Sequence, residues 1–156
     1  MLKLWAHECL RVFQDRLISQ EDRDLFQTML AEIFKDKFKK EWSSIVKIEP
    51  LLFASFVPLC YPGGDTTKKP FTNVYCELYD RAKTRRAAND SLDSYNSMNV
   101  SKRMNLVLFD SAIEHIVKIH RVITTEFGHA LLIGVGGSGR KSLTELAVFI
   151  AAYDTF

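Results

Sequence analysis

The sequence predicts an α/β chain that is mostly helical and ends in a strand, a glycine-rich loop and a helix. Three observations predict this fold class. Apolar residues recur at spacings of three and four through much of the chain, as on the buried face of a helix. A compact apolar run at residues 129–135 is short enough for a buried strand. The glycine-rich segment 134–142 follows that run directly and leads into another helical pattern.

Two helices are expected in the first third of the chain, over residues 1–17 and 19–42. Ser19 followed by Asp22 resembles a capping box, which marks the start of the second helix. The apolar faces of the two helices consist of Leu2, Trp5, Cys9, Val12, Phe13 and Leu17, and of Leu25, Met29, Leu30, Ile33, Phe34 and Phe38.

The middle of the chain predicts an extended segment with an exposed loop, followed by two more helices. Residues 50–70 hold a short apolar run and a Pro-Gly-Gly-Asp turn at residues 62–65. Residues 74–94 contain neither Gly nor Pro and predict a third helix. A fourth is expected over residues 106–122, closed by Gly128 in the left-handed conformation that commonly ends a helix.

The C-terminal pattern predicts a strand over residues 129–135 and a helix over residues 143–153. Little sequence follows this helix, so a parallel partner for the strand has no residues left to form it. A lone buried strand would leave backbone donors and acceptors unpaired. We therefore expect the chain to be a fragment of a longer polypeptide.

Composition excludes several classes of partner. The 21 basic residues nearly balance the 19 acidic ones, which argues against nucleic acid or an anionic membrane. No apolar run approaches the ~20 residues of a membrane span. The three cysteines are widely spaced and form no CxxC pair, which favours reduced thiols in the cytosol. The histidine and cysteine spacings do not predict a metal site.

The glycine-rich segment resembles the phosphate-loop pattern GxxxxGK[ST], whose backbone N–H groups surround phosphate oxygens at a helix N-terminus. Laid on this pattern from Gly134, the second glycine is Gly139. Arg140 takes the lysine position and Lys141 the Ser/Thr position. The expected nucleotide-binding residues are Gly134, Gly136, Gly137, Ser138, Gly139, Arg140, Lys141 and Ser142.

Both chemical positions of the loop depart from the pattern. Arginine can reach a phosphate, but lysine cannot ligate Mg²⁺, and Ser142 lies about 100° further round the helix. ATP or ADP binding is therefore expected, with Mg²⁺ only weakly supported. Two alternatives remain: a frame shifted by one residue, which pairs Lys141 with Ser142, and a plain strand-to-helix turn that binds no ligand.

The chain resembles the dynein heavy chains, in particular the axonemal ones. The sequence from Asn105 onward, NLVLFDSAIEHIVKIHRVI with GHALLIGVGGSGRKSLTELAVFIAAY, is similar to the start of their fourth AAA+ module, which usually has Gln where Lys141 stands. Residues 4–17, LWAHECLRVFQDRL, resemble a signature of the helical lid of the third module. The two signatures bracket the chain, so the resemblance covers essentially all of it.

The resemblance implies an AAA+ helical lid followed by the first strand, P-loop and helix of a P-loop NTPase module. Residues 1–72 would be the lid of one module, 73–103 a helix and connecting segment, and 104–156 the start of the next module. Arg11 would match the lid arginine that can face a nucleotide. An ion pair of Arg11 with Glu8 or Asp15 on the helix surface is the alternative.

The resemblance also implies a role. The parent would be an ATP-driven, minus-end-directed microtubule motor of the cytoplasm and cytoskeleton, in the axoneme of cilia and flagella. Its partners would be the remainder of the heavy chain ring, the intermediate and light chains, and microtubules, with neither nucleic acid nor membrane. No acidic Walker B strand is present, so this chain alone is not expected to hydrolyse ATP. The alternative function is a purely structural ring or interaction segment with an empty P-loop.

Overall fold

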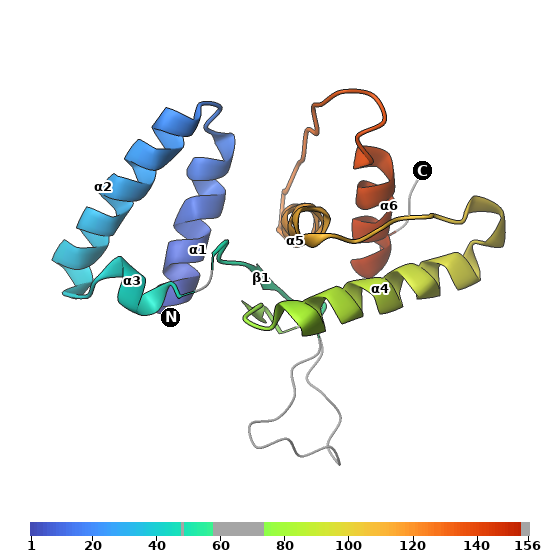
Figure 1. The fold of residues 1–156 in the computed structure, drawn as a ribbon, viewed down its shortest axis with the longest axis horizontal. Coiled ribbons are helices and arrows are strands. Elements are labelled where there is room, and N and C mark those ends of the chain that lie inside the picture. Colours follow the sequence, from blue (N-terminus) through green and yellow to red (C-terminus); the bar gives the residue numbers. More distant parts are fainter. Residues whose placement is uncertain (48, 58–73, 154–156) are drawn as a thin grey trace, which may run out of the picture. The chain divides into compact units, whose positions relative to one another are not determined.

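The computed structural model describes residues 1–47, 49–57 and 74–153, and the chain divides into two compact units, Met1–Phe53 and Ala54–Phe156. The described residues are mostly helical (Figure 1). Their sheet has two short strands, β1 (Phe53–Ala54) and β2 (Cys76–Glu77). The predicted mostly helical fold class is therefore confirmed. Strand β1 lies within the extended segment predicted over residues 50–70, whereas neither strand lies in the predicted strand at residues 129–135.

The first unit is a helical hairpin with a short third helix. Its elements are α1 (Leu2–Val12), the 3-10 turn η1 (Gln14–Arg16), α2 (Gln20–Phe38) and α3 (Trp42–Ile45). Figure 1 shows α1 and α2 side by side, with α3 beside the C-terminal end of α2. The two helices expected from the apolar spacing are therefore present, but the first, predicted over residues 1–17, ends at Val12 and is followed by η1.

Local chemistry sets both ends of α2. The Ser19 hydroxyl oxygen accepts a hydrogen bond from the Asp22 backbone N–H at 3.1 Å, which confirms the predicted N-terminal cap. The prediction that this helix continues to residue 42 is wrong. Lys39 adopts the left-handed conformation with φ 54°, and its N–H bonds to the Lys35 carbonyl at 2.9 Å, which ends the helix at Phe38.

Aromatic rings form the centre of the first unit. Phe34 is fully buried, and its ring centroid lies 5.8 Å from that of Trp5, 5.0 Å from Phe38 and 5.6 Å from Trp42. The break after Phe38 allows α3 to direct Trp42 back against Phe34. The packing of this ring therefore depends on residues from three helices.

His7 is a buried member of the first unit. The side chain is fully inaccessible to solvent, and Nδ1 lies within hydrogen-bond distance of the Leu51 carbonyl oxygen at 2.9 Å. The imidazole ring also packs on Phe53 at 5.0 Å. His7 therefore joins α1 to the segment that follows α3.

The second unit contains α4 (Arg81–Met98), the 3-10 turn η2 (Val100–Lys102), α5 (Asp110–Thr124) and α6 (Arg140–Ile150). The helix predicted over residues 74–94 begins later, because Cys76 and Glu77 pair in the sheet and Asp80 caps α4. The Asp80 carboxylate accepts a hydrogen bond from the Lys83 N–H at 2.9 Å. The helix predicted from residue 106 begins at Asp110.

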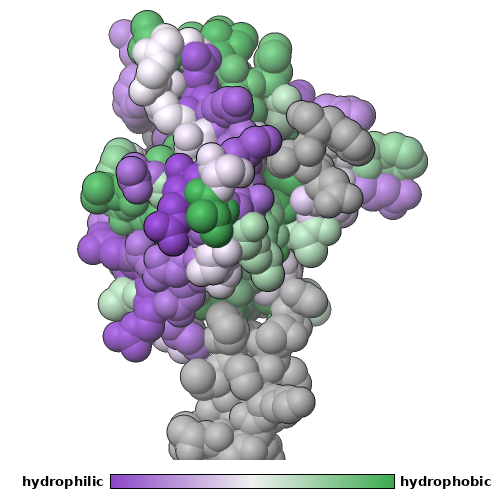
Figure 2. All heavy atoms as spheres, turned by 90° about the vertical axis from the view of Figure 1, so that its right-hand side faces the viewer, coloured by the Kyte–Doolittle hydropathy of each residue, from purple (hydrophilic) through white to green (hydrophobic). Residues whose placement is uncertain are grey.

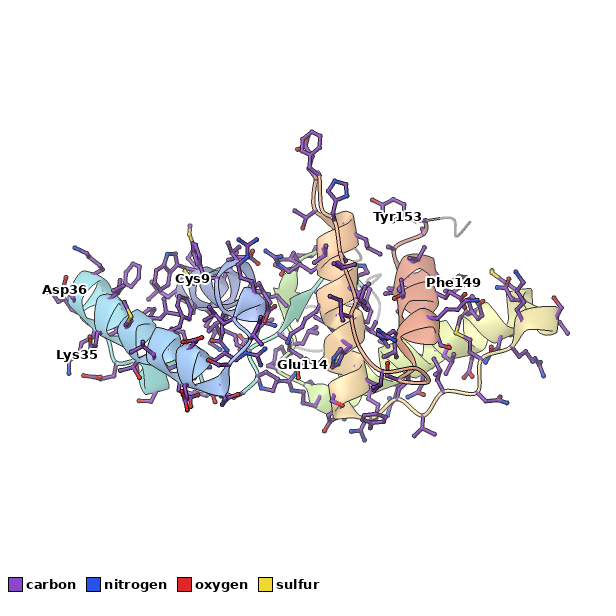
Figure 3. All side chains as sticks on the ribbon, turned by 90° about the horizontal axis from the view of Figure 1, so that it is seen from above. Cys9, Lys35, Asp36, Glu114, Phe149 and Tyr153 are labelled. Atoms are coloured by element: carbon purple, nitrogen blue, oxygen red, sulfur yellow. The ribbon has the colours of Figure 1, made fainter. Side chains whose placement is uncertain are left out.

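The core of the second unit lies where α5 and α6 meet, with α4 packed against α6. Ile116 of α5 and Leu146 of α6 are fully buried. Phe149 of α6, labelled in Figure 3, meets Tyr95 of α4 edge to face at a ring-centroid distance of 5.4 Å. This packing holds α6 against the other helices of the unit.

Residues 125–139 form an arch that joins α5 to α6 (Figure 1). The predicted strand over residues 129–135 does not form. Leu131, Ile133 and Val135 are 85%, 85% and 82% exposed. Figure 2 shows green apolar spheres at the top of the view, where the arch lies in Figure 1. Within the described residues no strand lies beside this segment to pair with its backbone, so no ladder forms.

The prediction that Gly128 closes the helix in the left-handed conformation is wrong, because α5 ends at Thr124 and its C-cap residue Thr125 is extended. The left-handed residue is Phe127, the neighbour of Gly128, with φ 55°, and Gly128 has no positive φ. A Cβ on Gly128 would lie 1.8 Å from the Val122 carbonyl oxygen. Glycine is needed here because the backbone passes too close to the end of α5 for any side chain.

Some predicted features lie outside the described residues. These are the turn at residues 62–65, the exposed loop around it and Cys60. Cys9 and Cys76, which are described, are free thiols. In the described part of the chain, no helix combines the length and apolar character that a membrane crossing requires.

Candidate phosphate-binding loop

The backbone of residues 134–139 has the freedom and the open space that a phosphate-binding loop needs. Gly137 and Gly139 have φ values of 78° and 74°, in the left-handed region that favours glycine. A Cβ built on Gly136, Gly137 or Gly139 would meet nothing within 4 Å. The space beside these three backbone positions is therefore open to a ligand oxygen.

Helix α6 begins at Arg140, directly after the loop. Gly139 is its N-cap and offers no side-chain oxygen to the first N–H groups. The first four N–H groups of a helix have no intrahelical acceptor, and the helix dipole adds positive potential at the same end. The helix predicted from residue 143 thus starts three residues earlier, which makes Arg140 and Lys141 its first two residues.

Arg140 folds back along the arch. Its guanidinium donates a hydrogen bond to the Val135 carbonyl at 2.9 Å and a longer one to the Leu132 carbonyl at 3.4 Å. The same group passes close to Gly134, where a Cβ would lie 3.4 Å from Nη1. Arg140 therefore fastens the two ends of the glycine loop together while placing a positive charge beside it.

Lys141 points into solvent. Its side chain is 89% exposed, and Nζ lies 3.8 Å from a carboxylate oxygen of Glu145 on the next turn. Such an exposed pair contributes little to stability and leaves the ammonium able to meet an anion. Ser138 is exposed and Ser142 is half-buried.

The residues at this loop do not fit a Mg²⁺ ion. Mg²⁺ takes oxygen ligands in near-octahedral geometry, and the position that usually supplies a hydroxyl holds the Lys141 ammonium, which has donors only. In residues 1–47, 49–57 and 74–153, no group of three or more His, Cys, Asp or Glu side chains could hold a metal.

Arg11 lies in the first unit, near the end of α1. Its side chain is 7% exposed, and Nη1 lies 3.1 Å from the Asp15 carboxylate. Nε and Nη1 are buried without an aligned hydrogen-bond acceptor among the described residues. The contact with Asp15 is therefore an ion pair by distance but not a well-directed hydrogen bond.

Two features of the loop were not recognised in the sequence. The Lys141–Glu145 pair has the i, i+4 spacing of a helical ion pair and was detectable from spacing alone. The acceptors of Arg140 were not detectable, because they are backbone carbonyls whose positions depend on the path of the arch.

The sequence also matches known proteins. Residues 104–156 match the family described as the P-loop containing dynein motor region D4. Over 156 residues and 100% of its length, the chain is 39% identical to human dynein axonemal heavy chain 10. It is 39% identical to human dynein axonemal heavy chain 6 over 98% of its length. The dynein beta chain of the flagellar outer arm of Chlamydomonas reinhardtii is 38% identical over 99% of it.

These relatives are far longer than the chain. It spans 3% of heavy chain 10, 4% of heavy chain 6 and 3% of the algal beta chain. The match to heavy chain 10 runs through both units, whereas the family match begins at Met104, before α5.

Proposed function

Because the chain belongs to the dynein heavy chain family, we propose that residues 134–142 bind the phosphates of an adenine nucleotide within an axonemal motor. The nucleotide would be ATP or ADP, and its binding would contribute to nucleotide sensing and to the mechanics of the AAA+ ring. The observation that carries this proposal is the open glycine backbone in front of the uncapped N-terminus of α6.

The charges at the start of α6 support an anionic ligand. Arg140 and Lys141 place two positive side chains where the helix dipole is already positive, and the first turn holds no acidic residue. Cations at this end of a helix are unfavourable unless a negative group joins them. A phosphate chain would satisfy the free N–H groups and both cations at once.

We further propose that the two units come from successive AAA+ modules. Residues 1–72 would form the helical lid of the third module, 73–103 a helix and connecting segment, and 104–156 the beginning of the fourth. The start of the family match at Met104 supports the last boundary. In the complete heavy chain, a neighbouring strand would supply the partner that segment 129–135 lacks among the described residues.

Arg11 is the proposed lid arginine of the third module. Its buried guanidinium holds donors without aligned acceptors among the described residues, which suits a group that meets a nucleotide phosphate. The alternative, a purely structural ion pair, is supported by the 3.1 Å distance to Asp15. Substitution of Asp15 by Asn separates the two roles, because a phosphate contact of Arg11 would survive that change.

We propose that the complete heavy chain works in the axoneme, as the names of its relatives indicate for those proteins. The complete heavy chain would move along microtubules toward their minus ends in a cilium or flagellum, together with the rest of its ring and with intermediate and light chains. The second candidate function is a structural ring segment with an empty loop. The hydrogen bonds from Arg140 to the Val135 and Leu132 carbonyls favour it, since they stabilise the loop without a ligand.

The Gly136→Ala variant separates these two functions. The added Cβ meets nothing within 4 Å and Gly136 has no positive φ, so the fold should not change. If phosphate oxygens approach this backbone, the methyl group blocks them. We expect 8-azido-ADP to photolabel peptides of residues 134–142 in a motor domain that contains this chain, and the variant to lose that label at unchanged thermal stability. An unlabelled loop in the unmodified motor domain would favour the structural function.

A further inference from the structure

We infer that this loop binds its nucleotide without Mg²⁺, with the Lys141 ammonium in place of the metal ion. This inference rests on the proposed nucleotide binding and specifies its chemistry. It starts from the disagreement between the general phosphate-loop pattern, which places a Ser/Thr hydroxyl at the metal, and the residues that this chain places at the start of α6.

The position that normally ligates the metal is occupied by a cation. Helix α6 begins at Arg140, so Lys141 is its second residue and takes the place of the Ser/Thr hydroxyl in the unshifted frame. An ammonium group offers three donors and no lone pair, so it cannot ligate Mg²⁺. It also repels a divalent cation bound to the same phosphates.

Lys141 has the reach and the freedom to act as the counter-charge itself. The side chain is 89% exposed, and its ion pair with Glu145 is long at 3.8 Å. Arg140 is less free, because its guanidinium already donates to the Val135 carbonyl at 2.9 Å. Of the two adjacent cations, Lys141 is therefore the one that can turn toward a phosphate without breaking an existing hydrogen bond.

Ser142, the residue after Lys141, carries a hydroxyl that could ligate a metal ion. It would do so only if the motif were shifted by one residue, with the helix starting at Lys141. The observed start at Arg140 disfavours this, and Ser142 lies about 100° further round the helix than the second helical position. The shifted frame makes the opposite prediction about Mg²⁺, so one experiment can distinguish the two frames.

The experiment measures photolabelling of peptides of residues 134–142 by 8-azido-ADP in a motor domain that contains this chain. Mapping the label to these peptides separates this loop from any other nucleotide site. Each protein is titrated twice, once with excess Mg²⁺ and once with excess EDTA. The proteins are the unmodified domain and the variants Lys141→Thr, Lys141→Gln and Ser142→Ala.

For the unmodified loop, the 8-azido-ADP concentration that gives half-maximal labelling should be the same within about threefold in Mg²⁺ and in EDTA. Lys141→Thr places a hydroxyl at the metal position and removes the positive charge. Its half-saturation should therefore occur at an 8-azido-ADP concentration at least about tenfold lower with Mg²⁺ than with EDTA. Lys141→Gln removes the charge without supplying a hydroxyl, so it should bind about tenfold more weakly than the unmodified loop in EDTA. Ser142→Ala should keep the same ratio of half-saturation in Mg²⁺ to half-saturation in EDTA as the unmodified protein, whatever its overall affinity, because the Ser142 hydroxyl does not ligate a metal ion in this frame.

Other results would overturn the inference. Labelling that requires Mg²⁺ and is lost in Ser142→Ala would establish the shifted frame while leaving nucleotide binding intact. Equal labelling of Lys141→Gln and the unmodified loop in EDTA would show that Lys141 is not the counter-charge. Absence of label under both conditions in the unmodified domain would instead refute the proposed function itself.

Discussion

Replacing Phe34 by Leu tests whether the two units of the chain unfold separately. Phe34 is fully buried in the first unit and contacts Trp5, Phe38 and Trp42. The chain has two tryptophans, and both pack against this ring. Tryptophan fluorescence therefore reports on the first unit alone, whereas far-ultraviolet circular dichroism reports on the helices of both.

The expected loss follows from the contacts of the ring. A hydrophobic replacement of similar volume costs up to about 1.5 kcal/mol, and each aromatic pair contributes about 0.5–1.5 kcal/mol beyond burial. With partial repacking by leucine, we expect the first unit to lose about 2–3 kcal/mol of its free energy of unfolding. For a small unit with a urea m-value of about 1 kcal/mol per M, the midpoint should fall by about 2–3 M.

The assay is urea unfolding followed by both signals, with Ile116→Val as the matched variant. Ile116 is fully buried in α5 of the second unit, and its replacement should cost about 0.5–1.5 kcal/mol there. Phe34→Leu should move the fluorescence transition to lower urea concentration and leave the part of the dichroism transition that comes from the second unit in place. Ile116→Val should move that second-unit part of the dichroism transition and leave the fluorescence transition in place. Coincident transitions that move together in both variants would refute independent units.

Three further predictions concern the cap of α2, a buried histidine and the hydrolysis of ATP. Ser19→Ala removes the oxygen that caps α2 and should destabilise the first unit by about 1 kcal/mol in the fluorescence assay; no shift would mean that another group satisfies the Asp22 N–H. Burial lowers the pKa of His120 below its ordinary value of 6.5. The unfolded chain therefore binds a proton more readily than the folded unit, so the second unit should be most stable above pH 6.5 and lose stability as the pH falls. The dichroism midpoint should show this slope, and His120→Leu should flatten it. The isolated chain should release phosphate from ATP no faster than buffer does, and turnover that Arg140→Ala abolishes would contradict this.

Much of the candidate site was predictable because it is encoded locally. The glycine spacing, the basic pair and the apolar period after them predicted a loop in front of a helix, and α6 follows that loop directly. The Ser19 cap was predictable for the same reason, since its partner Asp22 lies three residues away. Each of these features depends on neighbours within about one helical turn.

The segment 129–135 shows where such reasoning ended. Its composition is that of a strand, but a strand also needs a partner. No described strand pairs with it, so no strand forms there, and Leu131 and Ile133 are exposed. The sheet pairs Phe53–Ala54, within the segment predicted to be extended, with Cys76–Glu77, which lies in the stretch predicted to be helical. Strand pairing joins residues distant in sequence, so a local pattern cannot specify it.

By itself, the sequence determined the amphipathic helices, the glycine loop and the resemblance to axonemal dynein heavy chains, since these depend on residue type and short spacing. Tertiary structure alone decided the left-handed break at Lys39, the need for glycine at position 128 and the direction of Arg140 toward backbone carbonyls. All three depend on where the backbone runs after the helices have packed. The spacing of apolar residues indicates which face of a helix is buried, but not how closely another part of the chain will approach that face.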